Sequence, residues 1–275
     1  MAHKHCRHHH QGSADAYKTL GERNKEHFDE VSGTAFDAPW IAQLCDQVSS
    51  ELRSHFQWIG VRDSKTGRET KMLDYACGNG VVSRVCFHDV QSRPRTADFG
   101  QALSPFIPSI RGIDISSGMV SQYNLLAEKV GYSREHMHAV HGDFLDAKAT
   151  PSPEVTSLDF HDFDLVVMSL ALHHVDDTDE MIRKLADRLA DGGVLVIVDW
   201  MDGSESGCQI PPLKDMPVKH TVSRMGFKEA DLKQSFEKAG LGDWGWKWFA
   251  SQSAVPEELG GKQQAFLARG VKRRG

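Results

Sequence analysis

The segment Met72–Gly80, with the sequence Met-Leu-Asp-Tyr-Ala-Cys-Gly-Asn-Gly, constrains the fold more than any other part of the chain. A short apolar run meets Asp74 and then breaks into Gly78-Asn79-Gly80, which is typical of a buried strand that turns sharply into a helix. Glycines at such a bend permit backbone conformations closed to other residues and let a ligand approach the main chain. Several nucleotide-binding folds share the pattern, so it indicates a ligand-binding α/β sheet without selecting one class.

Apolar strand candidates alternate with helix candidates through the middle of the chain. Near-continuous apolar strands separated by helices indicate a parallel sheet that is covered on both faces. We expect strands at Lys71–Ala76, Ile110–Ile115, His138–His141, Asp164–Leu172 and Gly193–Trp200, and helices at Val81–His88, Gly118–Val130 and Asp179–Ala190.

The remaining segments differ in composition from this alternating core. The stretch Asp89–Pro108 is long for a connection and rich in Pro, Ser and Arg, so we expect an irregular surface insertion. After Trp200 several Gly and Pro residues predict a long loop or short helices. A helix at Glu229–Ala239 and a terminal strand pair at Trp244–Ser251 and Gln263–Gly270 then complete the chain.

Bulk properties exclude several classes of protein. The chain has 275 residues, a formal net charge of −6 and a pI near 6.2, which argues against a general nucleic-acid binder. No apolar run is long enough to cross a bilayer, and the N-terminus lacks a hydrophobic signal stretch. Five scattered cysteines without CxxC spacing fit a reducing compartment. We therefore expect a cytoplasmic protein without nucleic-acid or membrane partners; the oligomeric state stays open.

The motifs that follow the glycine segment narrow the class. Ile113-Asp114, then Gly142-Asp143-Phe144, then a strand ending in Leu172-His173-His174 occur in that order. This series resembles the class I methyltransferases that use S-adenosylmethionine (SAM), over roughly residues 25–271. The resemblance implies a Rossmann-like, seven-stranded α/β sheet flanked by helices, with five parallel strands and a terminal pair that includes one antiparallel strand.

The domain organisation follows from the same resemblance. Residues 1–14 carry five histidines and are expected to be a disordered tail, in which a metal role is disfavoured because nothing around it suggests a packed site. Residues 15–275 are expected to form a single domain. Within it we expect a helical lid over the acceptor at 15–60, a cofactor-binding core at 71–200 and an acceptor-side loop at 201–227.

The resemblance also implies which residues hold the cofactor. Asp74 would orient the loop near the amino-acid part of the cofactor, although a carboxylate capping the turn would look the same. Asp114 can accept hydrogen bonds from both ribose hydroxyls, since a carboxylate is a bidentate acceptor. The remaining predicted cofactor residues are Ala76, Cys77, Gly78, Asn79 and Gly80 in the loop, Ile115 and Met119 against adenine, Gly142, Asp143 and Phe144 around the base, and Ser169 at the end of the fourth strand.

The residues that would bind or activate the methyl acceptor are marked less specifically than those that would hold the cofactor. His174 is a candidate general base because imidazole titrates near neutral pH, and its alternative role is purely structural. His220 lies in a His-Thr-Val-x-x-x-Gly-Phe stretch similar to that of some small-molecule members. It is a second catalytic candidate, which either faces the acceptor or acts as a base, and its alternative role is to anchor its loop. The candidate acceptor-binding residues are Tyr17, Phe28, His173 and Trp200. The rings of Tyr17, Phe28 and Trp200 either contact the sulfonium by cation–π interaction or pack in the core.

We expect no metal site. One could be built from His173, His174 and Asp176, but adjacent histidines tend to point apart on an extended chain. Ser169 also stands near the position where a catechol-type enzyme would need a magnesium-binding carboxylate.

These residues together predict an enzyme that transfers a methyl group from SAM to an O, N or S atom of a small, apolar or aromatic metabolite. One alternative is a non-catalytic member that keeps the fold as a binding or scaffold protein. Another is an NAD-dependent oxidoreductase, which is disfavoured because a dinucleotide site prefers Gly-x-Gly-x-x-Gly/Ala and the last position here is Ser83.

Overall fold

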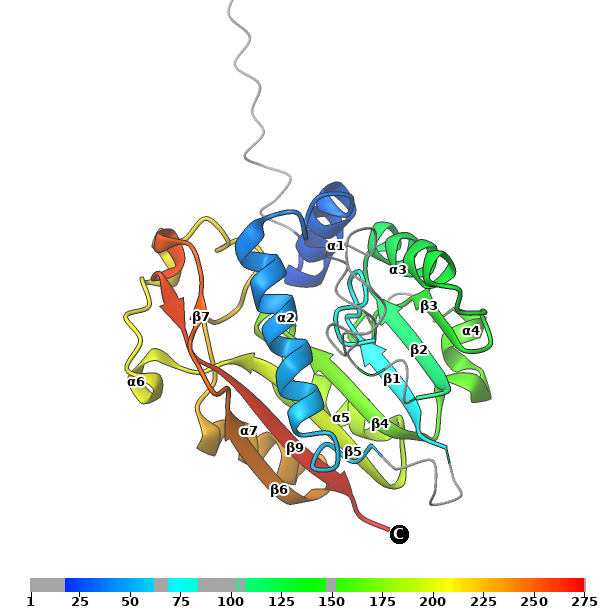
Figure 1. The fold of residues 1–275 in the computed structure, drawn as a ribbon. Helices are drawn as coiled ribbons and strands as arrows, with labels where there is room; N and C mark the ends of the chain where they lie inside the picture. The colour runs from blue at the N-terminus through cyan, green and yellow to red at the C-terminus, as the bar shows by residue number, and fades with distance from the viewer. Residues whose placement is uncertain (1–17, 62–68, 84–102, 104–106, 147–151, 275) are drawn as a thin grey trace, which may run out of the picture.

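A computed structural model describes residues 18–61, 69–83, 103, 107–146 and 152–274 of the chain (Figure 1). The predicted His-rich tail, Tyr17, most of the predicted helix Val81–His88 and most of the predicted insertion Asp89–Pro108 lie outside these residues. Residues 81–83, at the start of that predicted helix, form a turn.

Seven strands form one sheet in the order β3-β2-β1-β4-β5-β9-β6. The strands β1 to β5 run parallel, and β9 is antiparallel to both of its neighbours, β5 and β6. This confirms the predicted seven-stranded sheet with its one antiparallel strand. The strands are β1 (Lys71–Tyr75), β2 (Ser109–Asp114), β3 (Met137–His141), β4 (Phe163–Ser169), β5 (Leu189–Trp200), β6 (Leu241–Trp248) and β9 (Ala265–Lys272).

Helices cover both faces of this sheet. Successive residues of a strand therefore pack against different helices. In β4, Leu165 and Val167 pack in the same core as α2 (Pro39–Ser54) and α3 (Ser117–Val130). The intervening Val166 and Met168 pack instead with α5 (Thr178–Asp187) and α7 (Glu229–Lys238), as the alternation of side chains along a strand requires. Figure 1 shows α2 crossing the front of the sheet and α5 behind it.

Shorter elements surround this core. The helix α1 (Leu20–Val31) begins at a capping box in which Thr19 accepts from the backbone of Glu22, and the Glu22 side chain accepts from the backbone of Thr19. The other elements are the short helices α4 (Pro153–Thr156) and α6 (Gly203–Ser206), the 3₁₀ turns η3 (Leu158–Phe160), η4 (Leu172–His174), η5 (Leu213–Asp215) and η6 (Glu257–Leu259), and the strand pair β7 (Ser253–Ala254) and β8 (Lys262–Gln263).

Several sequence-based expectations are wrong in detail. The helix predicted to reach Ala190 ends at Asp187, and β5 begins at Leu189. The strand predicted to reach Leu172 ends at Ser169, because Leu170 adopts a positive φ of 51° and the chain then enters η4. The predicted surface insertion also contributes to the core at its end, where Leu103 and Ile107 are buried.

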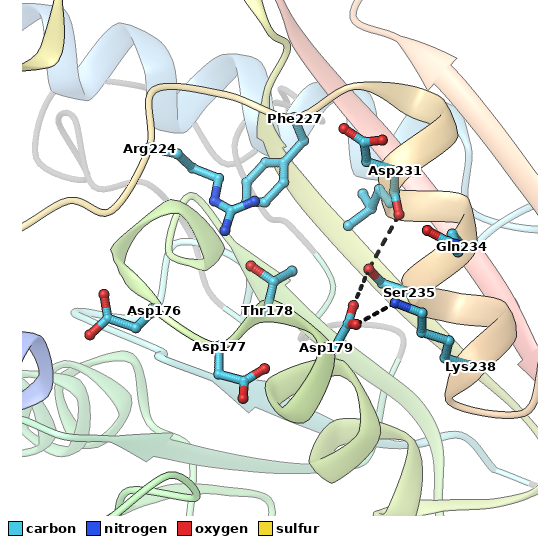
Figure 2. Close-up of a pocket in the computed structure, with 11 residues that line it drawn as sticks. Asp176, Asp177, Thr178, Asp179, Arg224, Phe227, Asp231, Gln234, Ser235 and Lys238 are labelled. Atoms are coloured by element: carbon cyan, nitrogen blue, oxygen red, sulfur yellow. Dashed lines mark hydrogen bonds and ion pairs between the residues drawn. The ribbon is translucent and has the colours of Figure 1, made fainter.

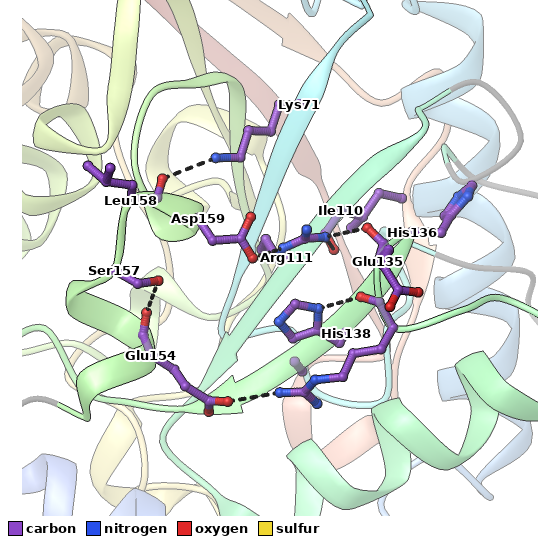
Figure 3. Close-up of polar contacts among 12 residues, drawn as sticks. Lys71, Ile110, Arg111, Glu135, His136, His138, Glu154, Ser157, Leu158 and Asp159 are labelled. Carbon is purple, nitrogen blue, oxygen red and sulfur yellow. Dashed lines mark hydrogen bonds and ion pairs between the residues drawn. The ribbon is translucent and has the colours of Figure 1, made fainter.

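The edge at which the parallel strands begin is closed by polar contacts (Figure 3). Arg111 of β2 donates from Nε to Asp159 at 2.6 Å, and Lys71 at the start of β1 donates to the carbonyl of His161 at 2.8 Å. His138 of β3 lies 2.7 Å through Nδ1 from the carbonyl oxygen of Arg134. These residues belong to the scaffold, and they supply matched controls for tests of the opposite edge.

We predict that Leu195→Ala, at the fully buried centre of β5, lowers the free energy of unfolding by about 2–5 kcal/mol. The loss has two parts, the hydrophobic transfer of the removed atoms and the cavity they leave. Urea denaturation of purified protein measures it. Leu158→Ala, at a side chain that is 86% exposed, should change stability by no more than about 0.5 kcal/mol. Equal effects of the two substitutions would contradict the described core.

Candidate functional site

A cavity of about 1330 Å³ lies at the edge where the parallel strands end. Its wall includes residues from the carboxyl ends of β1, β2, β3 and β4, together with residues of α1 and α2. In open α/β sheets, ligands bind at this edge. The volume exceeds the roughly 300–1,000 Å³ of a typical site for one drug-sized ligand, so it offers room for two small molecules side by side.

The glycine segment forms part of this cavity wall. Ala76 and Gly78 both adopt positive φ, at 55° and 52°, and both line the cavity with Cys77. For a non-glycine residue such as Ala76 this conformation is strained, and strain of this kind concentrates at ligand sites. Asn79 and Gly80 belong to the same turn but are not among the lining residues.

The ring of Phe36, from the segment between α1 and α2, lies against this turn. A Cβ atom at Gly78 would be only 3.2 Å from Cζ of Phe36. Phe36 also lines the cavity, although no sequence motif singled it out.

The carboxylate of Asp114 joins the ends of β1 and β2. One oxygen accepts from the backbone N–H of Gly78 at 2.8 Å, and the other from that of Ser116 at 2.9 Å. Burial raises the pKa of Asp114 to about 6, against the effect of these two hydrogen bonds; nearby His141 lowers it and nearby Asp29 raises it. A carboxylate oxygen has two lone pairs, so each oxygen can still accept one bond from a ligand in the cavity.

Asp74 on β1 has a buried partner that explains the departure from the dinucleotide pattern. The hydroxyl of Ser83 donates to Asp74 at 2.6 Å, and both residues are buried. Glycine or alanine at position 83 would leave this carboxylate oxygen without that donor.

The residues predicted to surround adenine meet at the ends of β2 and β3. Ile115, Met119, Gly142 and Asp143 all line the cavity. Burial raises the pKa of Asp143, whose carboxylate accepts from the backbone of Leu145 at 2.8 Å.

Phe144 is placed differently from the expectation. Its ring stacks on Tyr75 with 4.5 Å between centroids, and the guanidinium of Arg188 lies 4.5 Å from the centre of the same ring. Its backbone N–H also donates to the hydroxyl of Tyr75 at 3.0 Å. Phe144 is therefore held away from the cavity, and Leu145 lines it instead.

The segment after β4 brings two histidines to the cavity. Ser169, His173 and His174 all line it, and the two imidazole rings are 4.2 Å apart. The expectation that adjacent histidines point apart was wrong, because they lie on the turn η4 and not on an extended strand. Within the described part of the chain, no three His, Cys, Asp or Glu side chains are arranged to hold a metal ion.

The two histidines have different partners. His173 lies 2.7 Å through Nδ1 from the buried carboxylate of Asp199, at the end of β5. His174 lies 2.7 Å through Nδ1 from the carbonyl oxygen of Thr221. Burial holds the pKa of His174 well below its ordinary value, and the neighbouring His173 lowers it further.

His220 does not reach the cavity. Its side chain is exposed, its Nδ1 lies 3.2 Å from the carbonyl oxygen of Pro217, and its own carbonyl accepts from Nε of Arg23 at 3.0 Å. The ring contacts His27 of α1 at 5.2 Å between centroids. These contacts are those of a residue that anchors its loop to α1, which is the alternative that the sequence left open.

The helix α1 is tied across the cavity by side chains that the motifs did not reveal. Asp29 accepts from the hydroxyl of Ser116 at 2.7 Å and from the backbone of Gly118 at 3.0 Å, at the start of α3. Asn24 donates to the carbonyl of His174 at 3.2 Å. Burial alone would raise the pKa of Asp29, but these bonds and Lys25 hold it well below its ordinary value. No sequence motif marks Asp29, because Ser116 and Gly118 at the start of α3 are distant from it in sequence.

Phe28 and Trp200, both predicted to contact the acceptor, line the cavity as well. The edge of the Phe28 ring packs against His174 at 5.4 Å between centroids.

A second, smaller cavity of about 350 Å³ lies between α5 and α7 (Figure 2). Its wall is held by Asp179, which accepts from Lys238 at 2.6 Å and from Ser235 at 2.5 Å. None of the cofactor motifs contributes to this cavity. The large cavity is therefore the candidate site.

The sheet order and a cavity at the carboxyl edge of the parallel strands are typical of α/β proteins that bind a nucleotide or a related cofactor. Comparison with known proteins agrees: the methyltransferase domain family matches residues 45–244. The chain belongs to this family, and its fold is the one that SAM-dependent methyltransferases of known structure share.

Individual relatives are distant. An uncharacterised methyltransferase of Schizosaccharomyces pombe is 31% identical over 137 residues, which is 49% of this chain and 40% of that protein. The match therefore spans less than half the length of this curated relative.

Solved structures share the fold over most of the chain. A SAM-dependent methyltransferase from Anabaena variabilis has a TM-score of 0.59 at 16% identity, covering 94% of this chain and 96% of that one. The magnesium protoporphyrin IX methyltransferase of Synechocystis with bound SAM has a TM-score of 0.58 at 15% identity, covering 94% of this chain and 99% of that one. A phosphoethanolamine N-methyltransferase of Haemonchus contortus has a TM-score of 0.57 at 13% identity, covering 94% of this chain and 61% of that one.

No helix among the described residues has the length and apolar character needed to span a membrane.

We predict that Asp29→Ala loosens α1. The substitution removes hydrogen bonds from Ser116 and Gly118 that together should contribute about 1–2 kcal/mol. Amide hydrogen exchange in α1 should then be roughly five- to thirtyfold faster, with core strands unaffected. Glu26→Ala is the control, because Glu26 lies on the same helix and its ion pair among the described residues is with Lys18. Unchanged exchange in the Asp29 variant would show that α1 is held by other contacts.

Proposed function

We propose that this protein transfers a methyl group from SAM to a small, apolar or aromatic molecule bound in the same cavity. The observation that carries the proposal is that residues from every cofactor motif line one continuous cavity together with the acceptor candidates Phe28, His173 and Trp200, although they are scattered along the chain.

The sheet order supports a particular orientation of the cofactor. Asp143 follows β3, Asp114 ends β2, and Gly78 follows β1, so these residues succeed one another along one edge. An adenine at Asp143, a ribose at Asp114 and an amino-acid group at Gly78 would fit this succession. The sulfur and its methyl group would then face the end of β4, where Ser169 and His173 lie.

The part of the cavity beyond the cofactor residues is largely apolar. Side chains of Phe28, Trp40, Leu44, Trp200 and Val222 contribute to it. Among the described lining residues, Lys25 is the only lysine or arginine, and it pairs with Asp29 at 2.7 Å. This wall suits an extended apolar acceptor, such as the porphyrin that the Synechocystis neighbour's name indicates, better than a phosphorylated one.

When bound, SAM supplies an activated methyl group on a positively charged sulfur. The protein's own task is to align the acceptor atom with that group and to exclude water. The strained turn at Ala76 would place backbone N–H groups against the ligand, Asp114 would orient the ribose, and α1 would cover the bound molecules.

Binding calorimetry tests the cofactor assignment. Asp114→Asn should weaken SAM binding, because it removes one acceptor and the charge beneath the ribose. Wild-type affinity should also fall about tenfold from pH 7 to pH 5: ribose hydroxyls favour the ionised carboxylate, and the pKa of Asp114 without ligand is about 6. The Asn variant should lose this pH dependence.

Asp159→Asn is the matched control, since Asp159 is a carboxylate at the opposite edge of the sheet. It should leave SAM affinity unchanged. NAD titrated in parallel should not bind. Unchanged SAM affinity in the Asp114 variant would refute the ribose assignment, and binding of NAD in place of SAM would refute the proposed function.

A further inference from the structure

The pair formed by His173 and Asp199 stands out among the polar groups near the cavity. Asp199 is fully buried and accepts three hydrogen bonds: from Nδ1 of His173 at 2.7 Å, from the backbone of His173 at 3.2 Å and from the backbone of Trp200 at 2.7 Å. A carboxylate only accepts, so Nδ1 of His173 carries the ring proton. The other ring nitrogen, Nε2, is then a proton acceptor.

The fold positions His173 where the ends of β4 and β5 border the cavity. Ser169 on β4 pairs with Val198 on β5, so the residues that follow these two positions lie at the same edge. His173 lines the cavity, whereas Asp199 lies behind it and is not a lining residue. No described residue hydrogen-bonds Nε2 of His173, which leaves that nitrogen available to a ligand.

We propose that His173, oriented by Asp199, is the general base of the reaction and that the acceptor is a hydroxyl group on an apolar or aromatic molecule. This inference rests on the proposed function and adds to it the acceptor atom and the residue that activates it.

The step balances as follows. The acceptor hydroxyl gives its proton to Nε2 of His173, while its oxygen forms a bond to the methyl carbon. The bond between that carbon and the sulfur breaks, and its electron pair stays on the sulfur, which becomes neutral. Asp199 stabilises the imidazolium, and the proton later passes to solvent. The pair uses the same logic as the His–Asp part of a hydrolase triad, in which the carboxylate fixes the tautomer and stabilises the charged ring.

His174 is less suited to this task. Its Nδ1 proton is directed to a neutral carbonyl, that of Thr221, so no carboxylate stabilises its charged form. Burial also lowers its pKa well below the ordinary value. With the rings 4.2 Å apart, a charge on one disfavours a charge on the other, so only one histidine can take the proton.

The need for a base selects the acceptor atom. A neutral amine already carries the electron pair that attacks, and a thiol with a pKa near 8.5 is partly ionised at neutral pH. An aromatic hydroxyl, with a pKa near 10, stays protonated and becomes nucleophilic only as it loses its proton. A buried histidine–carboxylate pair at the reacting end is therefore most useful to a hydroxyl acceptor.

Methyl transfer to matched probes tests the proposal in the 275-residue chain. The probes 2-naphthol, 2-naphthylamine and 2-naphthalenethiol share one apolar scaffold and differ only in the acceptor atom. With labelled SAM, the wild-type protein should methylate 2-naphthol. His173→Gln and Asp199→Asn should each lower kcat/KM for 2-naphthol by about 100-fold or more, the range of general-base catalysis. For a nitrophenol that is already ionised at the assay pH, kcat/KM should fall only a few-fold in the same two variants.

His138→Gln is the matched control. His138 is as buried as His173, at 8% exposed for both, and it also makes one hydrogen bond through Nδ1, but it lies at the opposite edge of the sheet (Figure 3). This variant should retain the wild-type rate with every probe.

A second readout does not depend on turnover. Nitrogen NMR of ¹⁵N-histidine-labelled protein should show His173 with its proton on Nδ1 in the wild type. Asp199→Asn should shift the proton towards Nε2, because the asparagine amide can donate to Nδ1. An unchanged tautomer would refute the positioning role of Asp199.

The outcomes separate this inference from the proposed function. Absence of SAM binding in the wild type would refute the proposed function itself. SAM binding with no transfer to any hydroxyl probe, or with transfer to the amine or thiol alone, would refute the hydroxyl acceptor. Equal losses for 2-naphthol and the ionised nitrophenol would show that His173 only shapes the cavity. If His173→Gln and Asp199→Asn act on the chemical step, both variants should bind SAM with an affinity within about twofold of wild type.

Discussion

The buried carboxylate of Asp114 is the interaction on which the rest of the site depends. It accepts hydrogen bonds from the backbone N–H groups of Gly78 and Ser116 and so fixes the ends of two neighbouring strands relative to each other. Burial makes the charged form costly and raises the pKa of this carboxyl group to about 6. A ligand that donates further hydrogen bonds to this carboxylate would stabilise its charged form, and part of the binding free energy would come from that stabilisation.

The same edge of the sheet orders the proposed chemistry. Residues after β3, β2 and β1 are assigned to the cofactor, and those after β4 and β5 to the acceptor, so the reacting groups meet where the two halves adjoin. Asp199 can support His173 because the parallel pairing of β4 and β5 ends both strands at one level. The helix α1 closes this edge through Asp29 and Asn24, which tie it to α3 and to η4.

Periodicity and motif order predict most of this architecture because buried parallel strands read as apolar runs and their glycine turns are conspicuous. Local geometry was harder. The chain leaves the strand at Leu170, and apolar character alone cannot signal a positive φ there. Phe144 was expected beside adenine, but its partners Tyr75 and Arg188 are distant in sequence. The role of Asp199 depends on strand register, and that of Asp29 on helix packing, neither of which a single sequence displays.

The most direct test of the account is a crystal structure of the protein with S-adenosylhomocysteine. We expect adenine beside Asp143 and Leu145, the ribose hydroxyls within hydrogen-bond distance of Asp114, and the sulfur facing the end of β4 near His173. A cofactor bound in the reverse direction, or one whose sulfur lies away from His173, would contradict the proposed arrangement of the site.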